Sequence, residues 1–250
     1  DDLDVLERYG LVDDAWAAVV AGRLSAVSFL EFAERFGAER STSVWQALLV
    51  GLRGLGRLLV DDSDFEQLQR RVARLLEPVV ADLGEPAEGE HELTAKLRGT
   101  LVAALAVLGD HLPTIERARA VYDASTAGEA VDPELLAAAT SVVAATGDAA
   151  DYERVLGGYR NAATPQDSMR HLYALAEFPT EELVLRTCAL CFDGEVKTQN
   201  APFVLRSCMA NRRHGTAAWE FVRRHWAEAN EKFPRNTIVR MVETVKLLDR

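Results

Sequence analysis

The run HELTA, residues 91–95, comes closest in this sequence to a catalytic metal motif. The H-E-x-x-H motif places two histidines one helical turn apart, with the glutamate acting as general base. Ala95 stands where the second histidine would be, so only His91 could bind a metal from this run. Because a catalytic Zn²⁺ needs three protein ligands, we expect no zinc site here.

The cysteines offer a second candidate for chemistry, since Cys188 and Cys191 form a C-x-x-C pair. A redox C-x-x-C motif sits at the start of a helix, where the helix dipole lowers the thiol pKa. This pair lies late in a predicted helix, on its apolar side, and Cys208 does not supply a second ligand pair for zinc. We therefore expect buried packing residues. Three cysteines do not make a disulfide framework, which indicates a reducing cytoplasm.

Four arginines on apolar helix faces are the remaining candidates: Arg53, Arg57, Arg98 and Arg206. Such a guanidinium either pairs with an acid from a neighbouring helix or faces a cavity. In a cavity it could hold a carboxylate, such as a peptide C-terminus, through two hydrogen bonds. We keep all four as peptide-binding candidates. No nucleophile–base pair, phosphate-binding loop or dinucleotide motif is visible, so the sequence predicts no catalytic and no metal-ligating residue.

The charge distribution limits the partners of this chain. The 250 residues carry 28 basic and 39 acidic side chains, a formal net charge of −11. Nucleic acid is an improbable main partner, because phosphate neutralisation needs a basic surface. No apolar run approaches the roughly 20 residues of a membrane span. The sequence starts with two aspartates and no methionine, so we expect it to be part of a longer protein.

Helical periodicity runs through nearly the whole chain, and no alternating strand pattern is visible. Residues 84–92 read as a polar, mobile loop. Pro78 should kink or break its helix. Asn211 to Gly215 is predicted to make a turn between two helices, in which Gly215 can take the left-handed conformation. The expected helices are Val5 to Ala21, one capped by Ser25, Thr42 to Val60, Ser63 to Leu83, Leu93 to Leu108, Pro113 to Tyr122, one capped by Asp132, Asp148 to Tyr159, those capped by Thr164, Thr180 and Thr198, a second Trp-rich helix to Trp226, and Thr237 to Leu248.

About thirteen helices on short connections predict an all-α fold. The order of cap, amphipathic helix, tight turn and second helix returns about every 35–40 residues, which is typical of a HEAT-like or armadillo-like α-solenoid of antiparallel helix pairs. We expect one domain over residues 1–250, with a concave surface suited to an extended ligand. An irregular helical bundle is the structural alternative.

Runs in the last third of the chain and near its start carry a specific resemblance. The run GEVKTQNAPFVLRSCMANRRHGTAAWEFVRRHW, residues 194–226, and the run ERYGLVDDAW, residues 7–16, are similar to the C-terminal domain of aminopeptidase N-type (gluzincin) zinc aminopeptidases. Leu97-Arg98 resembles a further short motif of that domain. The likeness covers essentially the whole chain, in order, and is nearest to the bacterial cytoplasmic enzymes.

The resemblance implies a domain without a catalytic centre. In that family the zinc site lies in a catalytic domain upstream, and Thr114 stands where the third zinc ligand would follow HELTA. The HEAT-like C-terminal domain closes over the catalytic domain and forms a cavity that admits peptides. Basic and tyrosine side chains there receive the peptide C-terminus in some members, and Arg57 is the nearest basic residue. The implied partners are the catalytic domain of the same polypeptide and a peptide substrate. A free-standing α-solenoid that binds a protein partner is the alternative function.

Overall fold

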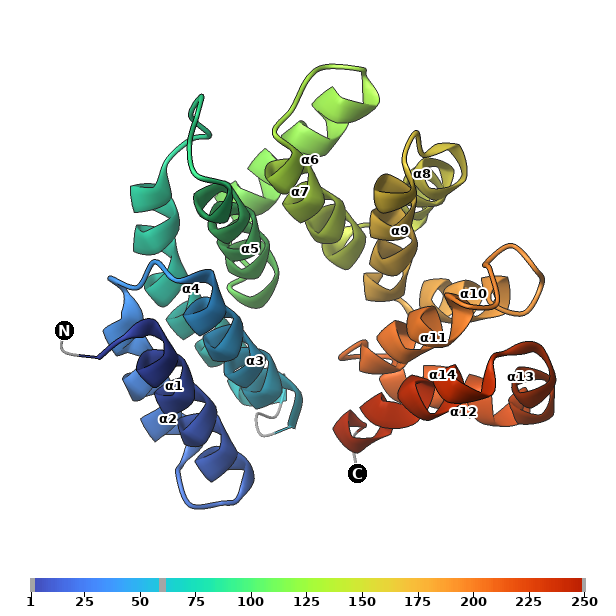
Figure 1. Cartoon of the computed structure of the whole chain (residues 1–250), viewed down its shortest axis with the longest axis horizontal. Coiled ribbons are helices and arrows are strands. Elements are labelled where there is room, and N and C mark those ends of the chain that lie inside the picture. The colour runs from blue at the N-terminus through green and yellow to red at the C-terminus, as the bar shows by residue number, and fades with distance from the viewer. Residues whose placement is uncertain (1–2, 59–61, 249–250) are drawn as a thin grey trace. The chain divides into compact units, whose positions relative to one another are not determined.

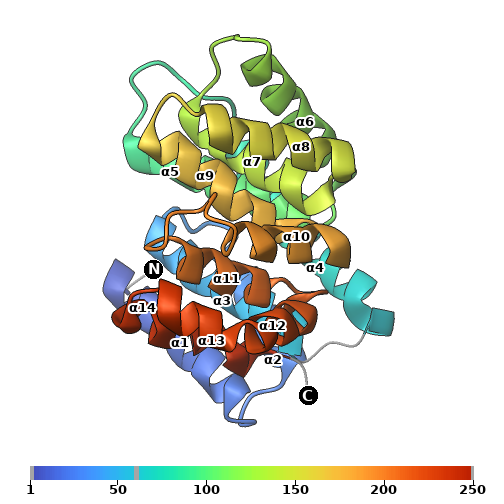
Figure 2. The same cartoon turned by 90° about the vertical axis from the view of Figure 1, so that its right-hand side faces the viewer.

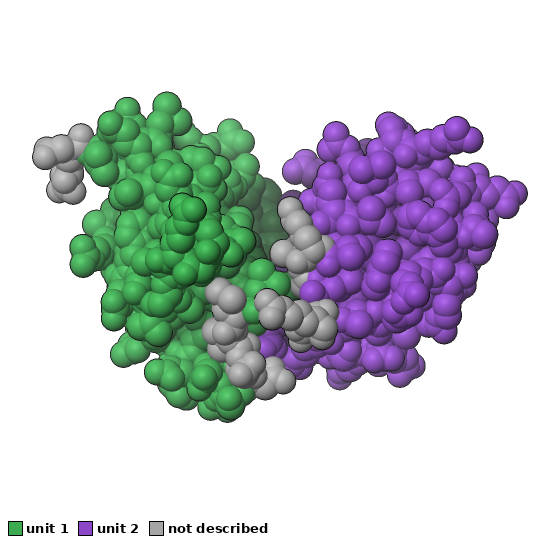
Figure 3. Space-filling model, turned by 90° about the horizontal axis from the view of Figure 1, so that it is seen from below, with its two compact units in different colours: residues 1–139 green, residues 140–250 purple. Residues whose placement is uncertain are grey.

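Helices make up almost all of this protein. The computed structural model describes residues 3–58 and 62–248. Within those ranges it contains fourteen α-helices, three short 3-10 helices and no strand (Figure 1). The prediction of an all-α fold with about thirteen helices is confirmed. The chain forms two compact units, residues 1–139 and 140–250, which divide within one helix (Figure 3). The assignment of residues 1–250 to one domain stays a prediction.

The first unit is built from helices that pack on their second neighbours as well as on adjacent ones. Helix α1 packs against α3 and α3 against α5, while α4 lies along α5. This alternation is the packing of an α-solenoid. The helices are α1 (Val5–Val20), α2 (Ala26–Ala33), η1 (Glu34–Phe36), α3 (Thr42–Leu58), α4 (Asp62–Leu83), α5 (Glu92–Leu108), α6 (Leu112–Thr126) and α7 (Pro133–Thr146), the last shared with the second unit.

Helix α3 forms the centre of the first core. Trp45, Leu48, Leu52 and Leu55 recur at helical spacing and are almost completely buried. Each large apolar side chain buried in this way stabilises the fold by about 1.5–3 kcal/mol. The indole N–H of Trp45 donates to the backbone oxygen of Glu39 at 3.0 Å, so the largest core side chain is also satisfied in its polar group.

The second unit repeats the same packing. Helix α8 lies along α9 (Figure 2), α9 contacts α11, α11 contacts α14, and α10 contacts α12. The ring of Tyr152 packs edge-on against Phe178, with centroids 5.0 Å apart. Its helices are α8 (Ala149–Asn161), α9 (Pro165–Ala174), η2 (Leu175–Glu177), α10 (Glu181–Leu190), α11 (Ala201–Ala210), α12 (Gly215–Arg224), α13 (Trp226–Lys232), α14 (Arg235–Met241) and η3 (Val242–Leu247).

Five predicted helix starts are confirmed by side-chain caps. Ser25, Asp132, Asp148, Thr164 and Thr180 each accept a hydrogen bond from a backbone N–H in the first turn that follows. Such a bond satisfies a donor that has no partner within the helix, and it stabilises the helix by about 1 kcal/mol. The five caps place five helix starts where the sequence predicts them.

Pro78 does not break its helix, contrary to one of the two predicted outcomes. Helix α4 runs without interruption from Asp62 to Leu83 with Pro78 inside it. A proline leaves the carbonyl four residues earlier, here that of Arg74, without its helical partner. Pro78 and Arg74 are both exposed, so water can bond that carbonyl. The predicted end of the preceding helix at Val60 lies outside the described residues.

The two helices predicted between Thr198 and Trp226 differ in part from the prediction. Helix α11 starts at Ala201 rather than after Thr198, and Gly215 is the first residue of α12, not a left-handed turn residue. The turn itself lies where it is predicted, between the end of α11 at Ala210 and the start of α12 at Gly215, and Asn211 holds it. Its side-chain oxygen accepts from the backbone N–H groups of residues 213 and 214, and its Nδ2 donates to the backbone oxygens of residues 176 and 178.

The two tryptophans of this region also separate. Trp219 is half-buried in α12, but Trp226 begins α13 and is 39% exposed. The single predicted helix is therefore two helices, which meet at His225. In the part of the chain that the structure describes, no helix has the length and apolar character needed to cross a bilayer.

Candidate functional site

Arg98, on α5, is buried and bonds to the end of α4 and to the loop that follows it. Its Nη1 and Nη2 donate to the two carboxylate oxygens of Glu90 at 2.7 and 2.6 Å. Its Nε donates to the backbone oxygen of Gly84 at 2.8 Å, and Nη2 also donates to that of Leu83 at 3.1 Å. These carbonyls belong to the end of α4, where helical partners are missing. We call this set, Arg98 with Glu90, Gly84 and Leu83, the Arg98 clasp.

The clasp explains why an arginine stands on an apolar face. The hydrogen bond from Arg98 holds the pKa of Glu90 below its ordinary value, so the pair stays charged at neutral pH. For a paired arginine the sequence predicts an acid on a neighbouring helix. The acid that pairs with Arg98, Glu90, lies instead in the loop between α4 and α5. With its donors engaged inside the fold, Arg98 is the least available of the four candidates. Its peptide contact stays a prediction.

Arg53 and Arg57 lie one turn apart on α3, in the first unit. Arg53 is exposed and Arg57 is half-buried, while Leu52 and Leu55 between them are buried in the core. The spacing therefore places both guanidinium groups beside the core-facing side of α3 rather than within it. Their role as peptide-binding residues stays a prediction.

Arg206 lies in the second unit, on α11, with an acid and a phenol beside it. Its Nη1 is 3.3 Å from Oε2 of Glu243, and both side chains are nearly half exposed. Burial raises the pKa of Tyr173 on α9, and the positive charge of Arg206 counteracts that rise. Tyr173 and Arg206 lie on α9 and α11, two helices that contact each other. A guanidinium and a phenol O–H are two donors that suit a carboxylate.

Sequence reasoning found Arg206 but missed its neighbours. Tyr173 and Glu243 stand on other helices, far from Arg206 along the chain, and no local pattern links them. Contacts of α11 with α9 and with η3 bring the three together. Glu243 already occupies one side of the guanidinium. We call Arg206, Tyr173 and Glu243 the Arg206 cluster.

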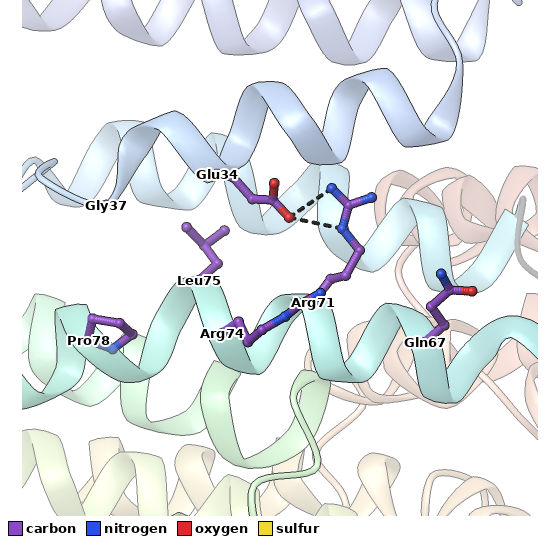
Figure 4. A pocket seen from close by; sticks show the side chains of 7 residues that line it. All are labelled: Glu34, Gly37, Gln67, Arg71, Arg74, Leu75 and Pro78. Carbon is purple, nitrogen blue, oxygen red and sulfur yellow. Dashed lines mark hydrogen bonds and ion pairs between the residues drawn. The ribbon is translucent and has the colours of Figure 1, made fainter.

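An open groove of about 640 Å³ lies between the end of α2–η1 and α4. Figure 4 shows Arg71 reaching across it to Glu34, whose Oε1 accepts from Nε of Arg71 at 2.9 Å. Gln67, Arg71, Arg74 and Pro78 follow one another at spacings of three or four residues. That spacing puts them on one face of α4, and it is the signal by which the sequence could have revealed the groove.

The sequence motifs that resemble chemical sites have structural roles. His91 is the N-cap of α5, and its Nδ1 accepts from the backbone N–H of Leu93 at 3.2 Å. Among the described residues, no group of three or more histidine, cysteine or acidic side chains could hold a metal ion. In this structure His91 caps a helix.

All three cysteines are buried free thiols. Burial raises the pKa of Cys191 well above its ordinary value, and contact with Cys188 together with burial does the same for Cys208. Cys191 donates to the backbone oxygen of Thr187 at 3.6 Å. Because the thiolate is the reactive form, Cys191 and Cys208 are poor nucleophiles. The packing role predicted for Cys188 and Cys191 agrees with their burial.

Comparison with known proteins places these features in a family. The family model described as "ERAP1-like C-terminal domain" matches residues 1–246. Aminopeptidase M1-A of Oryza sativa subsp. japonica is 27% identical over 97% of this chain and 28% of its own length. For the puromycin-sensitive aminopeptidase of Caenorhabditis elegans the values are 26%, 92% and 25%.

The alanine/arginine aminopeptidase of Saccharomyces cerevisiae is 24% identical over 90% of this chain and 27% of its own length. The chain thus spans little more than a quarter of the relatives that it matches. The match of the family model over nearly every residue decides the assignment. This chain belongs to the family of ERAP1-like C-terminal domains.

Proposed function

We propose that this chain is the C-terminal helical domain of a zinc aminopeptidase, in which it covers the catalytic domain and encloses a cavity for peptides. One observation carries the proposal: a C-terminal-domain family matches residues 1–246, while the chain spans little more than a quarter of aminopeptidases. The zinc and the general base would then lie in the rest of the protein. The chain itself would contribute confinement of the substrate and selection by peptide length.

The Arg206 cluster supports a role in peptide binding. It presents a half-exposed guanidinium beside a partly exposed phenol, and this donor pair suits the C-terminal carboxylate of a peptide. Arg53 and Arg57 stay separate peptide-binding candidates within the first unit. Peptide substrate and upstream catalytic domain are the partners in this proposal, without nucleic acid or membrane.

A bacterial, cytoplasmic setting belongs to the same proposal. The three cysteines support a cytoplasmic location. All three are free thiols, although Cys188 and Cys208 contact each other. Oxidising compartments favour disulfides, whereas the cytoplasm keeps thiols reduced. The relatives named above come from eukaryotes, so the bacterial origin rests on the sequence resemblance alone.

The test compares the full-length protein with residues 1–250 alone. We expect the full-length protein to hydrolyse an aminoacyl reporter and short peptides in a zinc-dependent way, and the isolated chain to do neither. In the full-length protein, Arg206→Ala should raise KM for peptides by about tenfold, the equivalent of one charge-assisted hydrogen bond. KM for the aminoacyl reporter, which is too short to reach the cluster, should stay the same.

Arg223→Ala is the matched control, because Arg223 is an exposed arginine of the same unit that pairs with its helix neighbour Glu220. Zinc-dependent turnover by the isolated chain would contradict the proposal. Equal changes of KM for reporter and peptides would remove Arg206 from the peptide site. If the full-length protein holds no zinc peptidase segment, the alternative of a free-standing interaction module takes over.

A further inference from the structure

The groove between the end of α2–η1 and α4 carries arginines in the more acidic part of the chain. Residues 1–150 contain 26 acidic and 13 basic side chains, yet Arg70, Arg71 and Arg74 follow one another closely on α4. The groove is lined by Arg71 and Arg74 together with Glu34, Gly37, Gln67 and Pro78. These six residues are called the α4 groove below.

Arg71 is held in place across the groove. Its Nε and Nη2 both donate to Oε1 of Glu34, at 2.9 and 2.8 Å, and its side chain is only 17% exposed. In Figure 4 the remaining nitrogen, Nη1, points away from Glu34, on the side of Gln67. A guanidinium has five N–H donors, and Glu34 does not use all of them. Arg71 therefore keeps donors for a second acceptor without having to move.

Arg74 adds a second guanidinium to the same site. It is exposed, and no acid in the described part of the chain forms an ion pair with it. The neighbouring Arg70, by contrast, pairs with Glu66 one helical turn away. Arg71 and Arg74 are three positions apart, which places their Cβ atoms about 5–6 Å from each other. A single carboxylate can therefore accept from both side chains.

Hydrogen-bond acceptors lie beside these donors. Pro78 leaves the carbonyl of Arg74 without its helical partner, and Pro78 is itself part of the groove wall. The amide of Gln67 contributes both an acceptor and a donor. Each residue of a peptide backbone likewise has one N–H and one C=O group that need partners. The α4 groove can therefore bond to a peptide backbone as well as to an acidic side chain.

The size of the groove suits a short extended peptide. Gln67 and Pro78 stand at its two ends along α4, roughly 16 Å apart at 1.5 Å per helical residue. An extended chain covers that distance with about five residues. The volume of about 640 Å³ lies within the range of about 300–1,000 Å³ that is usual for ligand sites. Leu75, which is buried, provides an apolar floor.

We propose that the α4 groove binds an extended peptide segment of about five residues with an acidic side chain at its centre. The carboxylate lies between Arg71 and Arg74 and accepts a charge-assisted hydrogen bond from each. Gln67 and the carbonyl of Arg74 bond to the peptide backbone. Glu34 holds Arg71 in the groove but also repels the bound carboxylate. The site is independent of the Arg206 cluster and of the proposed function.

The test measures the binding of two pentapeptides to the full-length protein by isothermal titration calorimetry. Both are N-acetylated and C-amidated, so that an aminopeptidase cannot degrade them and neither has a terminal carboxylate. Four positions are alanine, and the central residue is glutamate in one peptide and glutamine in the other. We expect the glutamate peptide to bind about tenfold more tightly, because only its carboxylate makes charge-assisted bonds to the arginines.

Arg74→Gln should remove this preference, because the carboxylate then has only Arg71, which it shares with Glu34. Arg70→Gln is the matched control. Arg70 is an exposed arginine on the same helix that pairs with Glu66 and does not line the groove, so this variant should keep the tenfold preference.

Glu34→Gln tests the proposal in the opposite direction. It removes the like charge beside the bound carboxylate, and the glutamate peptide should bind about threefold to tenfold more tightly than it binds to the wild type. Glu31→Gln, a substitution of another exposed acid on α2, should leave the affinity unchanged.

Three results would overturn the proposal. The wild type binds neither peptide, or binds both equally. Arg70→Gln weakens binding as much as Arg74→Gln, which would identify a general attraction to the charge of α4. Sodium acetate binds as tightly as the glutamate peptide, which would show that the groove takes an isolated carboxylate and not a peptide.

Discussion

Glu39 shows how a single carboxylate organises the start of the first unit. Its side chain is almost fully buried and accepts from Nε of Arg8 at 2.6 Å and from the backbone N–H groups of Ser41 and Arg40 at 2.7 and 2.8 Å. Burial raises the pKa of Glu39, but these hydrogen bonds outweigh it and hold the pKa below its ordinary value. The carboxylate thereby joins α1 to the start of α3.

Glu39→Gln should therefore destabilise the protein at neutral pH, by about 2 kcal/mol, since the charge-assisted bonds to Arg8 are lost. A carboxyl group with a lowered pKa in the folded state stabilises the fold above its unfolded pKa of about 4.3. That contribution disappears as the pH falls through the folded pKa. The difference in free energy of unfolding between wild type and variant, measured in urea, should be full at neutral pH and shrink in acid.

Glu31→Gln is the control for this measurement, because Glu31 is an exposed acid on the neighbouring helix α2. It should change the free energy of unfolding little at either pH. A Glu39→Gln difference that stays constant down to about pH 3 would contradict the linkage.

At the scale of helices, close contact between α5 and α7 depends on a residue without a side chain. A Cβ atom on Gly99 would lie 2.6 Å from the backbone oxygen of Glu134. Neither backbone can move without shifting its whole helix. A Cβ atom on Gly10, in α1, would meet no atom of another element within 4 Å. The two glycines therefore form a natural comparison within the first unit.

Gly99→Ala should lower the free energy of unfolding by about 1–3 kcal/mol, as overpacking does in a tight core. Gly10→Ala should raise it by about 0.5–1 kcal/mol, because alanine is the better helix former and has room. Urea denaturation of both variants measures the two signs. A loss of stability in both would mean that helix propensity and space do not explain the difference.

Most of the helices could be predicted from local sequence signals, whereas the candidate site depends on contacts between residues far apart in the chain. Caps such as Asp148 and Thr164 were predictable because each bonds to N–H groups two or three residues away. The turn at Asn211 was predicted as well, but the bonds from its amide to carbonyls some thirty-five residues earlier were not. The same limit applies to the candidate site. Arg206 could be named from its apolar surroundings, but Tyr173 and Glu243 only become its neighbours after the helices pack.

For the whole molecule, the division into two units within α7 has no counterpart in the sequence pattern, because helical periodicity continues across it. In a solenoid each helix pair is stabilised mainly by its neighbours, so stability can be lost locally. All three cysteines, Cys188, Cys191 and Cys208, lie in the second unit. Their labelling therefore reports on the opening of that unit alone.

Leu52→Ala, in the core of the first unit, should cost about 2–5 kcal/mol and increase amide hydrogen exchange there. The rate of thiol labelling in the second unit should not change. Val204→Ala is the control, because Val204 is buried on the same helix as Cys208 and should accelerate labelling. Equal acceleration by both variants would show that the two units unfold as one.

The Arg98 clasp also has a consequence for how the chain could vary in length. Arg98 bonds to the loop at Gly84 and again at Glu90. The two ends of the segment 85–89 therefore stay fixed whatever residues that segment contains. The free energy of closing a loop rises only slowly with the number of residues in it. Residues 85–89 are thus a place where an epitope or a fluorescent tag can be inserted while α4 and α5 keep their packing.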